Sequence, residues 1–426
     1  MCCDDSNMVY TNVYRIGNKL LQNIYKVLKI RWARKEVVTT EDGKDVIAHD
    51  NGNLLPIREA PTTSNNAVSV NEVFEGVFRL QNSRFTVTVE KGCITALFDR
   101  RAKRQVLSGR ANKFVIFDDK PIYWQAWDVE VFHLETREEL QSSITFISEK
   151  TPLRVSVVTE TKISDVSSIK TTISLPAAFD DGDDDGDDDD GSHSYVECTA
   201  EVDWHETMRF LKVEFPVDVR HHEASYDTQF GVIRRPTHYN TSWDMAKFEV
   251  CCHKYADLSE YGYGVSILND SKYGFATVGN TMRLSLLPSS EALDDKADMG
   301  KHTIRWAILP LQGSLGPETV RAAFNFNNPL KLVSISSDSP LNTCPITLTG
   351  DQNLVLDTLK RGEDDEDVSL GELSTRPSKS IIARVYESLG GRVRGKLETR
   401  WRLRSVHKTN ILEDDEEDVL LDNKQL

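Results

Sequence analysis

The chain has 426 residues, of which 39% are apolar, and a formal net charge of −16. This length is sufficient for two or more hydrophobic cores. The negative charge is concentrated in three acidic blocks, and without their 20 acidic residues the formal net charge is +4. Because the rest of the chain is nearly neutral and has no basic stripe with interleaved aromatic residues, we expect no nucleic-acid partner.

The three acidic blocks are nine Asp residues within 180–190, five acidic residues at 363–367 and six at 413–418. Such runs repel themselves, and they are typically solvated and disordered. We therefore expect a disordered insert at 179–193 and an acidic, disordered tail. A calcium loop is the alternative for the Asp run, but such a loop mixes carboxylates with carbonyl ligands and is closed by a Glu.

The seven cysteines include no C-x-x-C pair, which argues against a disulfide scaffold or a structural zinc site and favours a reducing compartment. No signal peptide is visible at the N-terminus, and no run of about 18 apolar residues could span a membrane. We therefore expect a cytoplasmic location and no membrane partner. A vacuole-like compartment reached without a signal peptide is the alternative.

The first predicted element is a helix, because apolar residues recur every three or four positions from Val9 to Leu28. No other strong helical pattern follows, so this helix would lack partner helices. We interpret residues 1–30 as the remnant of a helical bundle. Residues 31–72 are polar and are expected to form a linker with edge strands.

From residue 73 the apolar residues alternate with polar ones, as at Phe85, Val87 and Val89. Many short strands with turns between them predict a large antiparallel β-sandwich domain over 73–330, and a hairpin or small β domain over 331–426. At 210–219 the alternation loses its phase, which indicates a bulge or a strand buried on both faces. The other predicted strands are 94–98, 196–202, 263–268, 283–287, 303–309, 381–387 and 393–399.

Motifs for common chemistries are missing from the sequence: there is no phosphate-binding glycine loop, no G-x-S-x-G and no H-E-x-x-H. His221-His222-Glu223 resembles a metal cluster, but neighbours in a strand point to opposite faces. We therefore expect surface or interface histidines there. Trp124, Trp127 and Trp204 lie in strand-like segments and are expected to fill the core.

Several stretches resemble glycoside hydrolase family 38 α-mannosidases of the cytosolic and vacuolar branch. The most specific is residues 229–244 (QFGVIRRPTHYNTSWD), which continues into 258–270 (LSEYGYGVSILND). Residues 91–102 (KGCITALFDRRA) are similar to a family hairpin, and 119–130 (DKPIYWQAWDVE) are similar to a family strand, with Gln125 where the family usually has Asp. Arg384-Val385-Tyr386-Glu387 with Gly390-Gly391 resembles the closing strands.

The resemblance implies a mostly β fold of large antiparallel sandwiches, of the galactose-mutarotase-like type, preceded by a remnant helix. It also implies a retaining, zinc-dependent α-mannosidase that acts on mannose-containing oligosaccharides. In this family the zinc ligands and the Asp nucleophile come from an N-terminal module, and none of their motifs occurs in this sequence. We therefore carry over no catalytic residue and no metal ligand, and expect this chain alone to be inactive.

The stretch 229–244 holds the candidate substrate-rim residues, because aromatic rings and hydrogen-bonding groups together are typical of sugar sites. The alternative is a loop that locks itself and the catalytic domain together: Asn240, Thr241 and Ser242 would satisfy backbone groups and Trp243 would fill a core. Two further hypotheses are a non-catalytic carbohydrate-binding module and a homo-oligomer that uses an exposed apolar surface. The candidate residues are Arg235, His238, Tyr239, Asn240, Trp243 and Asp244.

Overall fold

The computed structural model describes residues 38–39, 45–48, 54–56, 68–178, 194–329, 346–366, 368–369, 380–399 and 403–419. The predicted helix at Val9–Leu28 and the acidic insert at 179–193 lie outside these residues. The chain divides into two compact units. One is Ala60–Asn327, and the other combines Met1–Glu59 with Asn328–Leu426.

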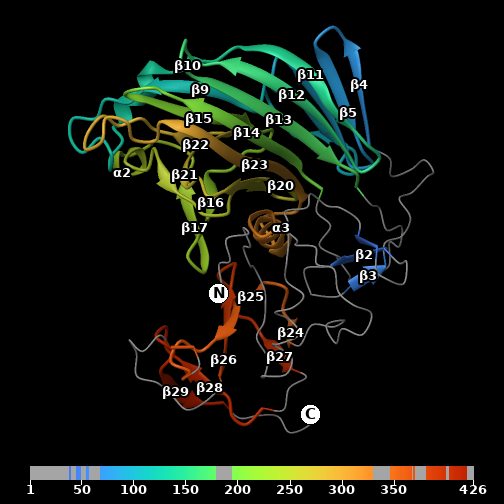
Figure 1. Ribbon diagram of the computed structural model, residues 1–426, viewed down its shortest axis with the longest axis vertical. Helices are drawn as coiled ribbons and strands as arrows, with labels where there is room; N and C mark the ends of the chain where they lie inside the picture. Colours follow the sequence, from blue (N-terminus) through green and yellow to red (C-terminus); the bar gives the residue numbers. More distant parts are fainter. Residues whose placement is uncertain are drawn as a thin grey trace. The chain divides into compact units, whose positions relative to one another are not determined.

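The largest sheet of the unit 60–327 has nine antiparallel strands. In Figure 1 its long strands β12, β13, β14 and β23 run side by side. In spatial order the sheet consists of β11 (Ser142–Lys150), β12 (Arg154–Lys162), β13 (Ser168–Pro176), β14 (Val196–Trp204), β23 (Gly300–Gln312), β20 (Tyr263–Asp270), β19 (Tyr255–Glu260), β16 (Glu223–Thr228) and β17 (Gly231–Pro236).

Two smaller antiparallel sheets belong to the same unit. The six-stranded sheet consists of β10 (Glu138–Glu139), β9 (Lys113–Asp118), β15 (Arg209–Pro216), β22 (Thr281–Leu287), β21 (Gly274–Val278) and β18 (Val250–Cys251). The five-stranded sheet consists of β4 (Ser69–Phe74), β5 (Val77–Gln81), β6 (Phe85–Glu90), β7 (Cys93–Asp99) and β8 (Arg104–Gln105).

One hydrophobic core joins these three sheets, because residues from all of them belong to the same buried cluster. Leu97 comes from the five-stranded sheet, Val213 from the six-stranded sheet and Trp306 from the nine-stranded sheet. The alternation of buried and half-buried residues in β6 shows why the sequence pattern predicts this strand. The predicted mostly β, antiparallel fold is confirmed.

Strand β15 explains the loss of phase at 210–219, because both predicted alternatives occur there. Six consecutive residues of β15 are buried, and its pairing with β22 shifts register between Leu211 and Lys212. Leu211, Val213 and Phe215 belong to the main core, whereas Phe210 belongs to a separate cluster. The strand is therefore buried on both faces, and the second face is partly polar.

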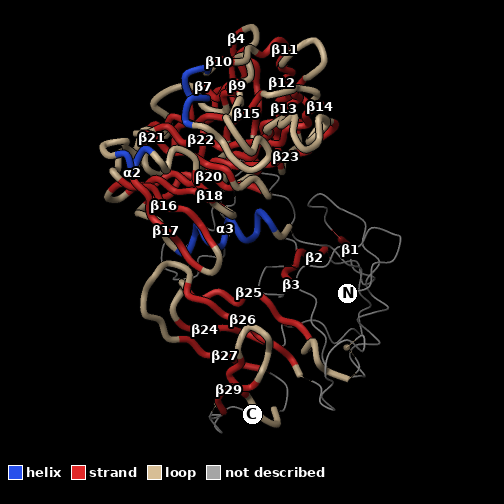
Figure 2. Tube along the Cα trace, turned by 90° about the vertical axis from the view of Figure 1, so that its left-hand side faces the viewer, coloured by secondary structure: helices blue, strands red, loops and turns tan. Residues whose placement is uncertain are grey.

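Helix α3 (Pro317–Asn327) corrects the expectation that no helical pattern follows the first segment. It lies against the nine-stranded sheet at β19 and β20 (Figure 2), where the Thr319 hydroxyl is 3.2 Å from the Ser266 hydroxyl. Its buried face contains Thr and Ala besides Val320 and Phe326, so its hydrophobic contrast is weak in sequence. Among the described residues, the other helices are the 3-10 helix η1 (Val131–Thr136) and α2 (Ser242–Met245).

The second unit contains short strands that pair in small antiparallel sheets. In its N-terminal part, β1 (Val38–Thr39), β2 (Asp45–Ala48) and β3 (Leu54–Pro56) form one sheet. In its C-terminal part, β24 (Ile346–Gly350) pairs with β27 (Gly395–Thr399), β25 (Leu354–Arg361) with β26 (Ile381–Glu387), and β28 (His407–Thr409) with β29 (Asp415–Asp418).

Two residues of the C-terminal acidic blocks contradict the expectation that these blocks are solvated. Asp365 is fully buried and accepts a hydrogen bond from Arg361 Nε at 3.0 Å. Glu413 is also buried, with its carboxylate 2.7 Å from Lys360 Nζ and 3.2 Å from Arg384 Nη2. Because basic residues of the neighbouring β25 and β26 neutralise these charges, both carboxylates are part of the fold rather than of a solvated tail.

Candidate functional site

The candidate loop, residues 237–249, follows strand β17. Thr237 is buried and fixes the start of the loop, because its hydroxyl donates to the His221 carbonyl at 2.7 Å. Arg235 lies just before the loop and makes its contacts elsewhere: Nη1 donates to the Cys251 carbonyl at 3.0 Å, and the guanidinium lies 5.1 Å from the Tyr226 ring centroid. The structure therefore gives Arg235 a packing role between β17 and its neighbours.

A capping box shapes the middle of the candidate loop. The Thr241 hydroxyl accepts from the Asp244 backbone N–H at 3.1 Å, and the Asp244 carboxylate accepts from the Thr241 backbone N–H at 3.2 Å. His238 Nδ1 lies 3.7 Å from the same carboxylate and 3.4 Å from the Asn240 nitrogen. The structure thus brings His238, Asn240 and Asp244 together, and the Thr241 side chain satisfies a backbone group of the loop.

Two aromatic residues of the candidate loop, Tyr239 and Trp243, differ in how exposed they are. Trp243 is 81% exposed, so it does not fill a core as the loop-locking alternative required. Tyr239 is partly exposed, and burial of its hydroxyl raises the pKa, while the Arg283 charge lowers it and the Glu249 charge raises it. The phenol therefore lies near the charged groups of the six-stranded sheet, while Trp243 presents its ring to solvent.

A second set of exposed rings lies in residues 119–136, which we call the aromatic segment. Trp124 is 68% and Trp127 66% exposed, which contradicts the expectation that both fill the core; Trp204, by contrast, is fully buried as predicted. The Trp124 and Trp127 rings meet edge to face with centroids 5.7 Å apart. Their spacing of three residues already argued against the prediction that both fill one core, because residues an odd number of positions apart in a strand point to opposite faces.

Local hydrogen bonds hold the aromatic segment in a defined conformation. The Trp124 carbonyl accepts from the Trp127 N–H at 2.7 Å and from the Asp128 N–H at 2.9 Å. Gln125 Oε1 accepts from the backbone N–H groups of Glu291 and Ala292 at 3.1 and 3.0 Å. The segment is thereby joined to the connection between β22 and β23, and Gln125 supplies the acceptor oxygen that an Asp would also supply.

Beneath these loops, the outer face of β15 carries a buried polar cluster that sequence reasoning missed. The Lys212 side chain is fully buried and forms an ion pair with Glu249 at 2.6 Å. Glu214 pairs with Arg137 at 2.7 Å and with Arg283 at 2.8 Å. Burial alone would raise the pKa of Glu214, but hydrogen bonds and charges from the two arginines lower it to about 2.

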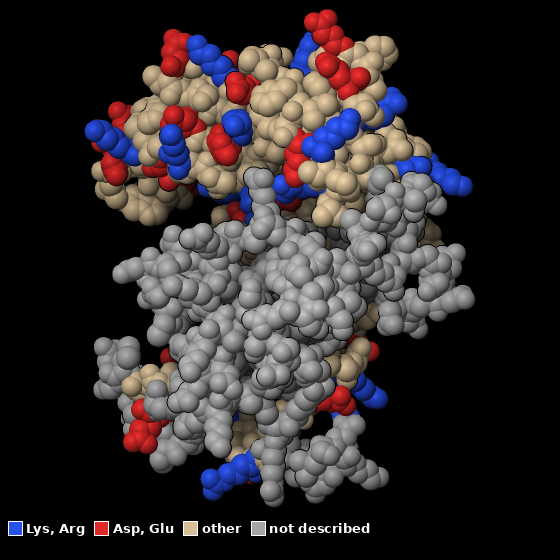
Figure 3. Space-filling view, turned by 45° about the vertical axis from the view of Figure 1, so that its right-hand side comes forward, with Lys and Arg blue, Asp and Glu red and all other residues tan. Residues whose placement is uncertain are grey.

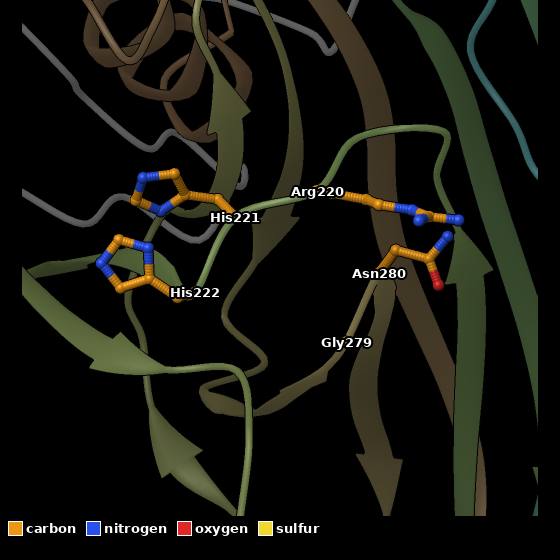
Figure 4. Close-up of a pocket in the computed structure, with 5 residues that line it drawn as sticks. All are labelled: Arg220, His221, His222, Gly279 and Asn280. Atoms are coloured by element: carbon orange, nitrogen blue, oxygen red, sulfur yellow. The ribbon is translucent and has the colours of Figure 1, made fainter.

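A shallow pocket of about 510 Å³ is lined by Arg220, His221, His222, Gly279 and Asn280. The two imidazole rings stack with centroids 4.4 Å apart, and they lie in the turn before β16 rather than in a strand. Strand alternation therefore does not apply to them. In Figure 4 the rings point to one side of the connection, whereas Arg220 points to the other side, towards Asn280. The polar groups do not converge on one ligand position.

Zinc is the metal that the family resemblance implies, and tetrahedral zinc sites need several His, Cys, Asp or Glu ligands together. Within the described residues, no three such side chains gather in a position to hold a metal ion. The described part of the chain therefore does not fit a zinc site. No helix among the described residues is long and apolar enough to cross a membrane.

The described surface of the unit 60–327 carries charges of both signs. On the face shown in Figure 3, Lys and Arg side chains are interspersed with Asp and Glu side chains. Many charged residues of the unit are paired, as Arg209 is with Asp118 at 2.6 Å. The visible described surface therefore has no single-sign stripe of the kind that binds nucleic acid.

Comparison with known proteins shows which family shares this architecture. The family model for the glycosyl hydrolases family 38 C-terminal domain matches residues 80–295, and the model for that family's C-terminal beta sandwich domain matches residues 353–425. The alpha-mannosidase of Saccharomyces cerevisiae is 44% identical over 354 residues, which are 78% of this chain and 31% of that protein. Alpha-mannosidase 2C1 of Homo sapiens is 36% identical over 332 residues, which are 74% of this chain and 30% of that protein.

A solved structure shows the same fold. The crystal structure of an alpha-mannosidase from Enterococcus faecalis V583 superposes with a TM-score of 0.62 at 12% identity, over 82% of this chain and 40% of that chain. The chain thus spans about a third of the length of its curated relatives. The chain belongs to glycosyl hydrolase family 38 and corresponds to the C-terminal domains of that family.

Proposed function

We propose that this chain is the non-catalytic C-terminal part of an α-mannosidase that hydrolyses mannose-containing oligosaccharides with retention of configuration. The observation that carries the proposal is the match of both family domains, in order, over residues 80–295 and 353–425. The relatives that share this region are named alpha-mannosidases. The candidate loop lies within the first matched domain.

The substrate-contacting part of the proposal rests on the exposed groups of the candidate loop. Trp243 offers an aromatic face to the C–H surfaces of a sugar, and His238 and Asn240 offer hydrogen-bonding groups to its hydroxyls. The capping box at Thr241 and Asp244 keeps these groups in place. We assign Arg235 to supporting the loop from β17, because its guanidinium is occupied by a backbone carbonyl and a ring.

Zinc and the nucleophile belong, in this proposal, to the family's N-terminal module. When bound there, zinc would supply Lewis-acid chemistry, and that module would also supply the Asp nucleophile. The residues of the present chain bind and orient the sugar at the rim and exclude water around it.

A second candidate function is a carbohydrate-binding or self-associating module. It is favoured by apolar side chains that stay exposed on and beside the aromatic segment, namely Ile122, Phe132 and Leu293. Such a patch typically marks an interaction site. Sedimentation of the 426-residue chain over a range of concentrations tests it, and a monomer at all concentrations contradicts self-association.

A chimera tests the main proposal. The matched third of the Saccharomyces cerevisiae alpha-mannosidase is replaced by this chain, and hydrolysis of a chromogenic α-mannoside is measured with added zinc. We expect the chimera to hydrolyse the substrate and this chain alone to be inactive. Trp243→Ala in the chimera should raise KM, whereas Tyr261→Ala, an exposed ring on another hairpin, serves as the control. Turnover by the chain alone contradicts the proposed division.

We further propose a cytoplasmic location, with a vacuole-like compartment as the alternative. The free thiols of Cys93, Cys198, Cys251 and Cys252 support a reducing compartment. Cell fractionation with a tagged chain tests this, and recovery in an oxidising secretory fraction contradicts it.

A further inference from the structure

The Lys212 side chain connects segments that lie far apart in the chain. It projects from the outer face of β15 and is fully buried. Its ammonium group lies 2.6 Å from Glu249 Oε2 and 3.0 Å from His133 Nε2, and 4.2 Å from the Phe210 ring centroid. Glu249 closes the candidate loop and His133 lies in the aromatic segment, so one ammonium group reaches both.

The partners of His133 determine how it binds Lys212. Its Nδ1 lies 2.7 Å from the Glu130 carbonyl, which can only accept, so Nδ1 carries the proton. Nε2 is then an acceptor and receives a hydrogen bond from the Lys212 ammonium. Burial, followed by the Lys212 charge, lowers the pKa of His133 to about 4, so the ring is neutral at pH 7.

Glu249 connects the candidate loop to the same Lys212 ammonium group. One carboxylate oxygen accepts from Lys212, and the other accepts from the Ser285 hydroxyl on β22. The preceding residue, Phe248, lies with its ring centroid 5.9 Å from that of His133, so the two segments also touch each other directly. The cluster thus joins two strands of the sheet to two loops.

The two loops that meet at this cluster are those that carry the exposed rings. Residues 121–130 form turns without strand pairing, and the underside of the segment packs through Val129 and Leu134 on Phe117 and Phe210. This apolar contact is not directional. The charged cluster supplies directional contacts from the sheet side, in addition to the hydrogen bonds that Gln125 accepts from Glu291 and Ala292.

We propose that Lys212 is a positioning residue: it holds the aromatic segment and the candidate loop against the six-stranded sheet so that their exposed side chains form one mannoside-contacting surface. The proposal deepens and rests on the proposed function, since the ligand is the sugar of that function. Lys212 itself is buried and does not touch the ligand.

Hydrogen exchange of the 426-residue chain provides the first test. In Lys212→Met the exchange of the Trp127, Asp128 and α2 amides should become at least about tenfold faster relative to that of the β13 and β14 amides than it is in wild type. Leu97→Ala, which makes a cavity in the distant five-stranded sheet, destabilises the unit without changing the loop amides selectively. Unchanged loop amides in folded Lys212→Met overturn the proposal.

A paired substitution separates positioning from stability. Lys212→Met leaves Glu249 as an uncompensated charge, whereas Lys212→Met with Glu249→Gln removes both charges and should recover much of the thermal stability. We expect the loops of the double variant to remain fast in exchange although the melting temperature recovers. Full recovery of loop protection in the double variant shows a merely structural role and overturns the proposal. If Lys212→Met does not fold, the double variant, which leaves neither charge unpaired, is compared directly with wild type.

Calorimetry with a high-mannose oligosaccharide provides the ligand test. Wild type and Leu97→Ala should bind equally, and Lys212→Met and the double variant should bind about tenfold more weakly. If Lys212→Met binds the oligosaccharide as tightly as wild type does, Lys212 does not position the side chains that contact the ligand. If wild type itself does not bind, the proposed sugar contact fails, and the exchange experiment still decides whether Lys212 positions the loops.

Discussion

Replacing Asp119 with Asn should stabilise the unit 60–327 at neutral and alkaline pH. Asp119 is buried, and its Oδ1 has no hydrogen-bond partner among the described residues. Burial raises the pKa of this carboxyl from 3.8 to about 6, although the nearby Lys212 charge lowers it. The ionised form is thus costly in the fold, and Asn has nearly the same shape without the charge.

The size of the effect follows from linkage. A pKa raised from 3.8 to about 6 corresponds to about 3 kcal/mol of folding free energy lost when the carboxyl is ionised. Because the folded pKa is the higher one, wild type regains this stability as pH falls from 6 to 3.8. We expect Asp119→Asn to gain about 1–3 kcal/mol above pH 7, since the amide keeps buried polar atoms. The gain should disappear below pH 4.

The titration of His133 makes this prediction more specific, because it changes the folding free energy with pH in the opposite direction to that of Asp119. Its pKa is lowered from 6.5 to about 4, so the stability it contributes is present above pH 6.5 and is lost as pH falls through 4. In wild type the gain from Asp119 and the loss from His133 nearly cancel between pH 6.5 and 4. In Asp119→Asn only the loss of about 3 kcal/mol remains, so its stability should fall steeply with acid.

Urea unfolding at several pH values between 4 and 8, followed by tryptophan fluorescence, measures these differences. Trp204 and Trp306 are fully buried in this unit and report its unfolding. Asp295→Asn, the same change at an exposed position of the same unit, is the control and should show no pH-dependent difference. The reasoning is refuted if Asp119→Asn is no more stable than wild type at pH 8, or if its advantage persists at pH 4.

The remaining predictions concern single contacts. Gly92→Ala should cost at least about 2 kcal/mol in urea unfolding, because Gly92 has φ +75° and an added Cβ would collide with the Ser142 side chain. Thr241→Ala should weaken the capping box by about 1 kcal/mol, seen as faster exchange of the α2 amides with an unchanged global midpoint. Trp306→Phe should cost about 1–3 kcal/mol in the same unfolding assay, because Nε1 donates to Asn112 Oδ1 at 2.9 Å inside the core.

Local sequence patterns predicted the strands well because strand formation depends on alternation within a few residues. Phe85–Glu90 and Val196–Trp204 alternate clearly and form β6 and β14. The capping interaction of Thr241 with Asp244 is equally local, and it is a contact that the self-locking alternative allowed for Thr241. The exposure of Trp124 and Trp127 was missed, because large aromatic residues are usually buried and local pattern does not show which face another segment covers.

Strand β15 shows why the buried polar cluster escaped prediction. Its apolar residues at 211, 213 and 215 build the main core, and Lys212 and Glu214 on the other face build the floor beneath the loops. The irregular alternation was visible in the sequence, but the partners of the two buried charges are distant in the chain. His133 lies 79 residues and Glu249 37 residues from Lys212, and Arg137 lies 77 residues from Glu214. A charged residue inside an apolar strand needs such partners, since an unpaired buried charge is too costly to persist. A lysine between two core residues therefore predicts a distant carboxylate, although the sequence alone does not say which one.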